Sequence, residues 1–406
     1  MQIYEKVGEL LATVLFRIFG IMKILILSCN TGEGHNSSAN SLKKHFESVG
    51  AECEVADTLA LVSETISKRV SDMYVFSTKS SLFENAYRLG GYVSDIGEDI
   101  GGGMLKSPVY LTNKLYANKL YNHITEGGFD AVVCVHLFPA EAISALKRRA
   151  KLDVPAIFVM TDYTCIPFLP ETCLDKYVIA HEDLIEEYVE KGIPREKIVP
   201  IGIPVDEERF TARTERREAR ERACEIAGIE NSDGRWFLVM SGSMGFGNLG
   251  GLIAELLDHT VEKDRIICVC GRNEKLKARL EAEFEGQQAF KAIGFTREVP
   301  LLMDACDVLF TKPGGITSTE AAVKNIPLVH TAPIPGLEDY NARFFHYHNM
   351  SYSTTDVTMQ ASVALRLASD RAYRERMLEA QRRNANPHTC QDIYELITNT
   401  ITENEN

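Results

Sequence analysis

The feature that most constrains the fold occurs twice: an apolar strand runs into a glycine-containing turn and then a helix. The first strand is Lys23–Ser28 (KILILS) and the second is Trp236–Ser241 (WFLVMS). A strand that is apolar on both sides must be covered on both faces, as in a parallel sheet between two layers of helices. Further apolar runs and helical patterns alternate after each start, so the sequence predicts an α/β protein with two doubly wound halves.

The other expected strands follow these two starts in order. They are Cys53–Leu59, Ala131–His136, Ala156–Met160, Lys176–Ala180 and Ile198–Ile203 in the first half, and Arg265–Cys270, Ala289–Gly294, Asp307–Thr311 and Pro327–His330 in the second. Two similar halves that face each other form a cleft at the C-terminal ends of their strands, where α/β proteins bind ligands.

The length of 406 residues favours two domains, because a single core stops growing at roughly 250–300 residues. Residues 206–222 (DEERFTARTERREARER) are highly charged and predict a linker that leads into a solvated helix ending near Gly228. We expect an extension at 1–21, a first domain at 22–205, a second domain at 206–386, and a C-terminal helix at 387–406 that can cross back to the first domain.

Residues 1–21 carry apolar side chains at helical spacing, interrupted by charged ones. They indicate an amphipathic helix on a membrane, a helix packed on the domain surface, or an upstream extension of a protein whose working part begins at Met22. No apolar run reaches the roughly 18 residues that a membrane-spanning helix needs.

The formal net charge of −13 argues against nucleic acid as the main partner, because phosphate contacts require clustered Lys and Arg. The ten cysteines form no CxxC pair. We therefore expect reduced cysteines in a cytoplasmic protein, with neither a disulfide framework nor a structural metal site.

The turn in the first half, Asn30–Ser38 (NTGEGHNSS), precedes a helix that we expect from about Ser37. Gly34 lets the backbone approach a ligand, and His35 is placed to take a proton from an attacking hydroxyl. Alternatively, His35 caps the helix or binds a phosphate. Asp162, after the strand Ala156–Met160, is expected to orient His35 or the acceptor hydroxyl, or else to be an ordinary loop or cap residue.

Two loops of the second half carry polar groups after strands. One is suited to a diphosphate, although it has neither dinucleotide nor P-loop spacing, and a plain strand-to-helix turn is the alternative. The other is a rigid Pro/Gly loop whose polar residues suit sugar hydroxyls or simply reflect ordinary helix N-terminal acidity. The residues concerned are Gly242, Ser243, Met244 and Gly245 in the first loop, and Glu338 and Asn341 in the second.

A third loop, Thr311–Glu320 (TKPGGITSTE), turns at its glycines. We expect Thr317, Ser318 or Thr319 to cap the next helix. Glu320 is then in the first turn of that helix, where it either accepts both hydroxyls of a ribose or complements the helix dipole.

The segment Gly101–Thr125 contains lysines, tyrosines and leucines but no acidic residue. This composition fits an anionic membrane surface. Equally, it fits a solvent-facing helix whose apolar face belongs to the core.

In their order and spacing, these motifs resemble glycosyltransferase family 28, and within it the monogalactosyldiacylglycerol synthases and bacterial processive diacylglycerol glycosyltransferases. The resemblance runs from Met22 to about Asn349. Gly32–His35 matches the Gly-x-Gly-His turn of the family, whereas Thr164–Phe168 stands where members often carry a histidine and a tryptophan. The matches in the second half are Ser241–Gly247, Gly294–Thr296, Lys312–Gly315 through Glu320, and Pro335–Asn341.

The resemblance implies the GT-B fold, with two Rossmann-like domains facing a central cleft. It implies a UDP-sugar donor, no metal or other cofactor, and inversion at the anomeric carbon. The acceptor that it implies is diacylglycerol or a related lipid at the cytoplasmic face of the membrane. His35 would be the base or an acceptor contact. The UDP-sugar would be held by Gly294, Phe295 and Thr296 at the uracil, Glu320 at the ribose and Gly242–Gly247 at the diphosphate, with Lys312, Gly314, Gly315 and Thr317 beside them.

Three alternatives share this architecture. A UDP-N-acetylglucosamine 2-epimerase has the same donor site and needs no lipid acceptor. A peptidoglycan-type N-acetylglucosaminyltransferase is a near relative. A UDP-sugar-binding regulator without enzymatic activity would retain the donor half and tolerate the loss of His35.

Overall fold

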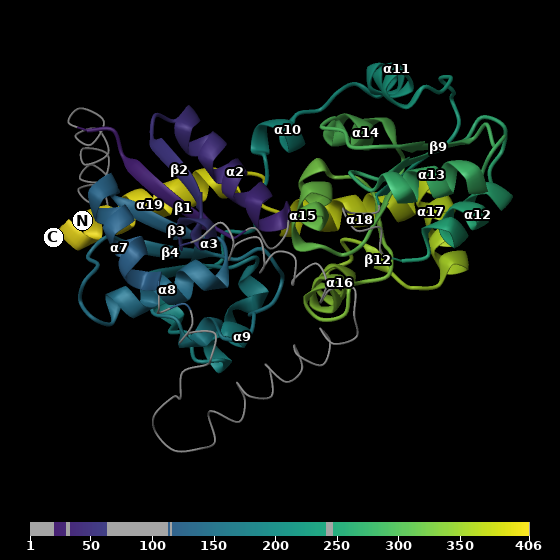
Figure 1. The fold of residues 1–406 in the computed structure, drawn as a ribbon. Helices are drawn as coiled ribbons and strands as arrows, with labels where there is room; N and C mark the ends of the chain where they lie inside the picture. Colours follow the sequence, from purple (N-terminus) through teal and green to yellow (C-terminus); the bar gives the residue numbers. More distant parts are fainter. Residues whose placement is uncertain (1–19, 30–32, 63–112, 114–115, 241–246, 406) are drawn as a thin grey trace. The chain divides into compact units, whose positions relative to one another are not determined.

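The computed structural model describes residues 20–29, 33–62, 113, 116–240 and 247–405. The chain forms two compact units (Figure 1). Unit 1 comprises Met1–Glu207 with His388–Asn406, and unit 2 comprises Glu208–Pro387. The expected boundaries were 205/206 and 386/387.

Unit 1 contains a parallel sheet of six strands in the order β2-β1-β3-β4-β5-β6. Alternate positions along β1 are equally buried, which explains why its sequence is apolar throughout. The register pairs Ile24 of β1 with Cys53 of β2 and Ala131 of β3. The strands are β1 (Lys23–Ser28), β2 (Glu52–Asp57), β3 (Ala131–Cys134), β4 (Ala156–Val159), β5 (Lys176–Val178) and β6 (Ile198–Val199).

Helices connect these strands, as parallel pairing requires. The described helices of unit 1 are α2 (Glu33–Ser48), α3 (Thr58–Val62), α7 (Ala117–Gly127), α8 (Leu137–Lys147), α9 (Ile185–Glu190) and α19 (Thr389–Glu405), with short 3-10 turns at Leu169–Glu171, Glu182–Leu184 and Arg195–Lys197. The apolar side of α7 is core, since Leu120 and Ile124 are buried. The rest of the basic segment Gly101–Thr125, apart from Asn113 and Tyr116, lies outside the described residues, as do residues 1–19 of the extension.

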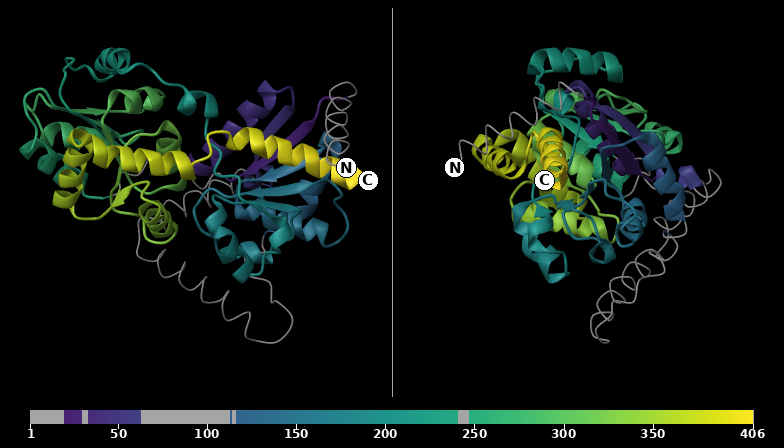
Figure 2. Two further views of the ribbon diagram at one scale, coloured as in Figure 1. Left: turned by 180° about the vertical axis from the view of Figure 1, so that it is seen from behind. Right: turned by 90° about the vertical axis from the view of Figure 1, so that its left-hand side faces the viewer.

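The last helix, α19, is part of the core of unit 1. It packs against α2 and runs along the sheet, where Figure 2 shows it in yellow. Its residues Cys390, Ile393, Ile397 and Ile401 join one apolar cluster with Ile24 of β1 and with Leu42 and Phe46 of α2. The core of unit 1 therefore includes a helix that follows all of unit 2 in the sequence.

Unit 2 contains a second parallel sheet of six strands, in the order β12-β11-β10-β7-β8-β9. Sequence analysis missed β12, whose two residues are too few to show a period. The strands are β7 (Trp236–Met240), β8 (Arg265–Val269), β9 (Phe290–Ile293), β10 (Val308–Thr311), β11 (Leu328–His330) and β12 (Tyr352–Ser353). The helices are α10 (Glu207–Thr211), which begins at the boundary, α11 (Arg216–Ala227), α12 (Leu249–Asp258), α13 (Glu274–Glu283), α14 (Val299–Ala305), α15 (Gly315–Lys324), α16 (Leu337–Tyr347), α17 (Val357–Ser369) and α18 (Arg371–Asn384).

The charged stretch before unit 2 is not simply solvated, which corrects the expectation for α11. Arg220 is buried, and its guanidinium lies over the ring of Trp236 with 5.0 Å to the ring centroid. It also pairs with Asp307 at 3.2 Å and donates to the carbonyl of Ala305. A hydrophobicity pattern cannot distinguish this arginine from its exposed neighbours.

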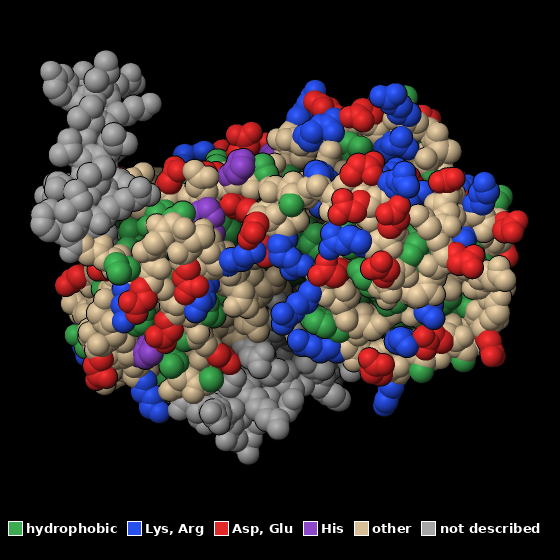
Figure 3. Space-filling model, turned by 90° about the horizontal axis from the view of Figure 1, so that it is seen from above, with side chains coloured by type: hydrophobic (Ala, Val, Ile, Leu, Met, Phe, Trp, Pro, Cys, Tyr) green, Lys and Arg blue, Asp and Glu red, His purple; other side chains and the backbone are tan. Residues whose placement is uncertain are grey.

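Within the described residues, no helix is long and apolar enough to cross a membrane. On the face drawn in Figure 3, Lys and Arg side chains are interspersed with Asp and Glu. That face therefore carries a mixed charge distribution.

Candidate functional site

The strand order of unit 1 reverses between β1 and β3, which are neighbours in the sheet although β2 lies between them in the sequence. Ligands of open α/β sheets bind outside the carboxyl ends of the strands at such a reversal. His35 follows β1, and His136 follows β3. Their imidazole rings meet edge to face, with centroids 4.7 Å apart.

His35 lies in the first turn of α2, because this helix begins at Glu33 and not near Ser37 as expected. Gly34 is therefore a helical residue and not part of the turn. A glycine costs a helix about 1 kcal/mol relative to alanine. The burial of Ala39, Leu42 and Phe46 farther along the same helix outweighs that cost.

The tautomer of His35 follows from its hydrogen bond. Nδ1 lies 2.8 Å from the carbonyl oxygen of Val135, which can only accept, so Nδ1 carries the proton. Burial lowers the pKa of His35 below the ordinary value, although the charge of Asp162 and the bond to Val135 act in the opposite direction. The neutral ring thus keeps its lone pair on Nε2, the atom that a general base uses.

His136 has the opposite tautomer. Its Nδ1 accepts the backbone N–H of Phe138 at 3.1 Å and so caps α8, which leaves the proton on Nε2. Burial, and secondly the nearby His35, lower the pKa of His136 well below its ordinary value. The ring of Phe138 also meets that of His136 edge to face, with centroids 4.7 Å apart. The switch point therefore has one histidine with a basic Nε2 beside another with an Nε2–H.

The charge of Asp162 acts on His35 and favours its protonated form, and the carbonyl of Val135 accepts the hydrogen bond from Nδ1 of His35. An orienting role of Asp162 remains a prediction. Between the two lies Thr161, whose Oγ1 is 3.3 Å from Nδ1 of His35 and 3.5 Å from Oδ2 of Asp162. Glu187 of α9 anchors the loop that follows, because its Oε1 accepts from Thr164 Oγ1 at 2.6 Å. The loop that carries Asp162 is thereby held close to His35.

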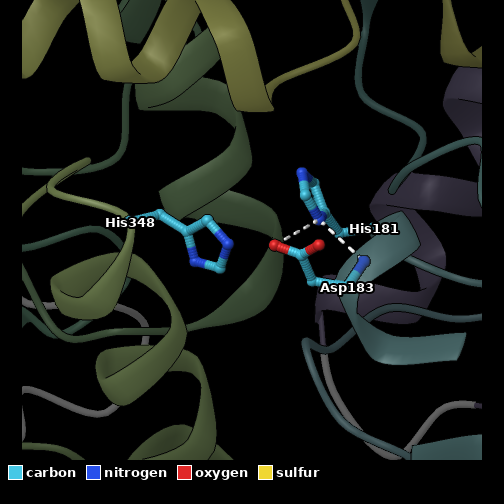
Figure 4. Close-up of side chains that lie close together, drawn as sticks. All are labelled: His181, Asp183 and His348. Atoms are coloured by element: carbon cyan, nitrogen blue, oxygen red, sulfur yellow. Dashed lines mark hydrogen bonds and ion pairs between the residues drawn. The ribbon is translucent and has the colours of Figure 1, made fainter. Parts of the chain in front are cut away.

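A histidine cap also occurs after β5. Nδ1 of His181 accepts the backbone N–H of Asp183 at 3.2 Å, and the Asp183 carboxylate lies 3.8 Å from the same nitrogen (Figure 4). His348, which the same view labels, belongs to unit 2, where its Nδ1 lies 2.9 Å from the carbonyl of Phe344. His181 thus has a local structural role as a cap.

The strand order of unit 2 reverses between β7 and β10. The loops after these two strands are the ones predicted to hold the diphosphate and ribose. Gly242, Ser243, Met244 and Gly245 lie outside the described residues. Gly247, at the end of this loop, has φ +94°, a conformation that favours glycine.

After β10, Lys312 forms an ion pair with Glu338 of α16. The second carboxylate oxygen of Glu338 accepts the backbone N–H of Ile334 at 2.8 Å. A Cβ atom added to Gly314 would lie 3.2 Å from Nζ of Lys312, so the glycine leaves room for this pair. The ammonium group is therefore held beside the N–H groups that begin α15, and an ammonium group next to a helix N-terminus suits an anion.

The helix after this loop starts earlier than expected. Its N-cap is Gly314, without a side-chain cap, so the predicted cap at Thr317, Ser318 or Thr319 is wrong. Ser318 instead contacts Nε2 of His330 at 2.9 Å, and Thr319 donates to the carbonyl of Gly315. Glu320 consequently lies in the second turn, three residues after Thr317 and on the same face of α15. The sequence alone does not show whether a glycine near a helix start belongs to the first turn of the helix or to the loop before it.

The start of α16 is a rigid corner. Gly336 has φ +115°, and its N–H donates to the Asp339 carboxylate at 2.9 Å. Asn341 is fully buried, whereas Glu338 is partly exposed. Sugar contacts by Glu338 and Asn341 remain predictions.

The neighbouring strands β8 and β9 end in an exposed aromatic platform. Phe295 is 59% exposed, and the guanidinium of Arg272, after β8, lies 5.1 Å from its ring centroid. The hydroxyl of Thr296 accepts the N–H of Glu298 and so fixes the turn after Gly294. A flat ring bordered by a cation suits a nucleobase.

Residues 35–205 match the family described as monogalactosyldiacylglycerol (MGDG) synthase. Among curated proteins, the processive diacylglycerol beta-glucosyltransferase of Bacillus pumilus is 29% identical over 94% of this chain and 97% of its own length. The enzyme of the same name from Bacillus subtilis is 28% identical over 80% of this chain and 81% of its own. The resemblance to the diacylglycerol glycosyltransferases is confirmed.

The fold of this chain is similar to that of known GT-B structures. MurG of Acinetobacter baumannii superposes with a TM-score of 0.60, at 15% identity over 93% of this chain and 99% of its own. HepE of Anabaena in complex with UDP-glucose gives a TM-score of 0.55, at 15% identity over 94% of this chain and 100% of its own. The UDP-GlcNAc 2-epimerase of Neisseria meningitidis gives 0.58, at 12% identity over 92% and 99%. The predicted GT-B fold is therefore confirmed.

Sequence reasoning missed two side chains at these sites, His136 and Arg272. Both follow buried strands, and that position was the available signal. A polar residue shortly after an apolar strand of a parallel sheet lies near the carboxyl edge of the sheet, where ligands of α/β proteins bind.

Proposed function

We propose that this protein is an inverting glycosyltransferase that transfers a hexose from a UDP-sugar to diacylglycerol or a related lipid at the inner face of the cell membrane. The observation that carries the proposal is the neutral His35 with its lone pair on Nε2, at the switch point of the unit that matches the lipid glycosyltransferase family. The names of the relatives support the acceptor, and the UDP-glucose complex of a structural neighbour supports the donor.

The proposed chemistry follows from the two sites. Nε2 of His35 removes the proton of the lipid hydroxyl as its oxygen attacks the anomeric carbon. The bond from that carbon to the diphosphate breaks, and UDP leaves. Lys312 and the N–H groups at the start of α15 stabilise the negative charge that develops on the leaving group. Glu320 accepts the ribose hydroxyls, and Phe295 with Arg272 supports the uracil.

The test uses the purified full chain with UDP-glucose, UDP-galactose and UDP-N-acetylglucosamine in turn, with and without diacylglycerol vesicles. UDP release and new glycolipid are measured together. Release that requires diacylglycerol and yields glycolipid supports the proposal and names the sugar. Turnover of UDP-N-acetylglucosamine alone, with no lipid product, would contradict the proposal and indicate the epimerase.

Replacing Lys312 by alanine is expected to raise KM for the donor by about 10- to 100-fold, because a charge-assisted contact contributes about 1.5–3 kcal/mol. Initial rates over a range of donor concentrations measure this effect. Lys275→Ala, which removes an exposed lysine from α13, is the matched control and should behave like the unmodified protein. Equal KM values for the two variants would exclude a donor contact by Lys312.

The pH dependence of kcat/KM is expected to report His35. The base works when unprotonated, so the rate rises with pH through its pKa and is constant above it. Because burial lowers this pKa, the midpoint should lie below the ordinary value of about 6.5. Asp162→Asn removes a charge that raises the pKa of His35 and should move the midpoint further down. A midpoint that does not move in Asp162→Asn would contradict this assignment.

Replacing His136 by asparagine is expected to lower kcat by about 10- to 100-fold through misplacement of His35. Asparagine can still cap α8, so the fold should be retained. Removal of the ring reduces the burial of His35, and the acid limb should therefore move to higher pH, opposite to Asp162→Asn. If kcat falls while the acid limb of the pH profile does not move, His136 does not act through His35.

A further inference from the structure

Unit 2 contains a cavity of about 910 Å³ that no part of the proposed reaction uses. It lies between the C-terminal end of α16, β12 and α18, whose labels locate it in Figure 1. Its size is within the usual range of about 300–1,000 Å³ for small-molecule sites. The predicted donor groups adjoin the other end of α16, which is roughly 16 Å long at about 1.5 Å per residue.

The wall of the cavity has an unneutralised cation. The two acidic residues of the cavity wall, Glu375 and Glu379, both form ion pairs with Arg382, which lies 3.0 Å from Glu379. The guanidinium of Arg376, in contrast, lies against the ring of Tyr373 at 5.6 Å from the centroid and pairs with no carboxylate among the described residues. An arginine in this state matches the geometry and charge of a phosphate group.

The rest of the wall combines polar and apolar side chains. The side chains of His346, Asn349 and Tyr352 line it; the first two are exposed and the third is half-buried. The rings of His346 and Tyr352 lie edge to face, with centroids 5.9 Å apart. Donors and acceptors around aromatic rings suit a compact polyol, whose hydroxyls need partners and whose C–H face packs on a ring.

We infer that this cavity binds a small sugar phosphate. The phosphate lies against Arg376, and the sugar hydroxyls bond to His346, Asn349 and Tyr352. This site does not depend on the proposed glycosyl transfer, because neither Arg376 nor its neighbours belong to the predicted donor or acceptor groups.

The test is isothermal titration calorimetry of the full chain with glucose 6-phosphate, glucose and inorganic phosphate. Glucose 6-phosphate should bind at least about tenfold more tightly than either part, because only it engages both sets of groups. Arg376→Ala should weaken its binding by about 10- to 100-fold. Arg371→Ala removes the same charge from the same helix outside the cavity and should leave the affinity unchanged.

Asn349→Gly is a second variant that separates the sugar contact from folding. Asn349 has φ +57°, which glycine adopts without strain, so only the amide is lost. The Asn349→Gly variant should bind glucose 6-phosphate more weakly but should bind inorganic phosphate as the unmodified protein does. The inference is overturned if glucose 6-phosphate binds no more tightly than phosphate, or if Arg376→Ala and Arg371→Ala bind alike. It is also overturned if binding is lost in Lys312→Ala but retained in Arg376→Ala, since the probe would then occupy the donor site.

Discussion

Alanine in place of His35 is expected to lower kcat by about 10²- to 10⁴-fold, the usual contribution of a positioned general base. The reason is the tautomer: Val135 holds the proton on Nδ1, so Nε2 is the basic atom, and alanine removes it. KM for the UDP-sugar should change little, because the residues proposed to bind the donor belong to unit 2. Glycolipid formation at saturating donor measures the loss.

His123→Ala is the matched control for this variant. It removes a histidine from the same unit whose Nε2 pairs with Glu54 at 2.8 Å and which lies outside the switch point. Added imidazole should restore part of the rate of His35→Ala, since it supplies the missing base. A His35→Ala variant that retains nearly full kcat, or one whose only defect is a raised KM, would exclude His35 as the base.

Alanine in place of Ile397 is expected to destabilise unit 1 by about 2–5 kcal/mol, because truncation of a fully buried isoleucine leaves a cavity. Ile397 is 0% exposed and packs in the cluster that also holds β1 and α2. Urea unfolding followed by circular dichroism measures the change. Hydrogen exchange in peptides from β1 and α2 should accelerate with it, which assigns the effect to unit 1.

Asn399→Ala, on the exposed face of the same helix, is the control for Ile397→Ala. It tests whether any change in α19 is enough to destabilise the unit. We expect its free energy of unfolding to match that of the unmodified protein within about 0.5 kcal/mol. If Ile397→Ala unfolds at the same urea concentration as Asn399→Ala, α19 is not part of the first core.

The sequence predicted the positions of those candidate residues that come shortly after an apolar strand. A fully apolar strand must be buried, and the residue after it must lie at the carboxyl edge of the sheet, so His35, Lys312 and Phe295 could be found from sequence. The starts of α2 and α15 were placed too late, because local rules treat Gly34 and Gly315 as turn residues. Packing of the apolar face farther along each helix outweighs the small cost of a glycine in its first turn.

The sequence by itself determined the fold class, the existence of two doubly wound halves and the polar groups at their strand ends, because burial pattern and turn chemistry are local properties. Only the tertiary structure decided which of these groups meet. The contact of His35 with Val135 and His136 joins residues 100 positions apart in the chain and depends on β1 and β3 being neighbours. The same holds for α19, since an amphipathic helix specifies that one face is buried but not which core it completes.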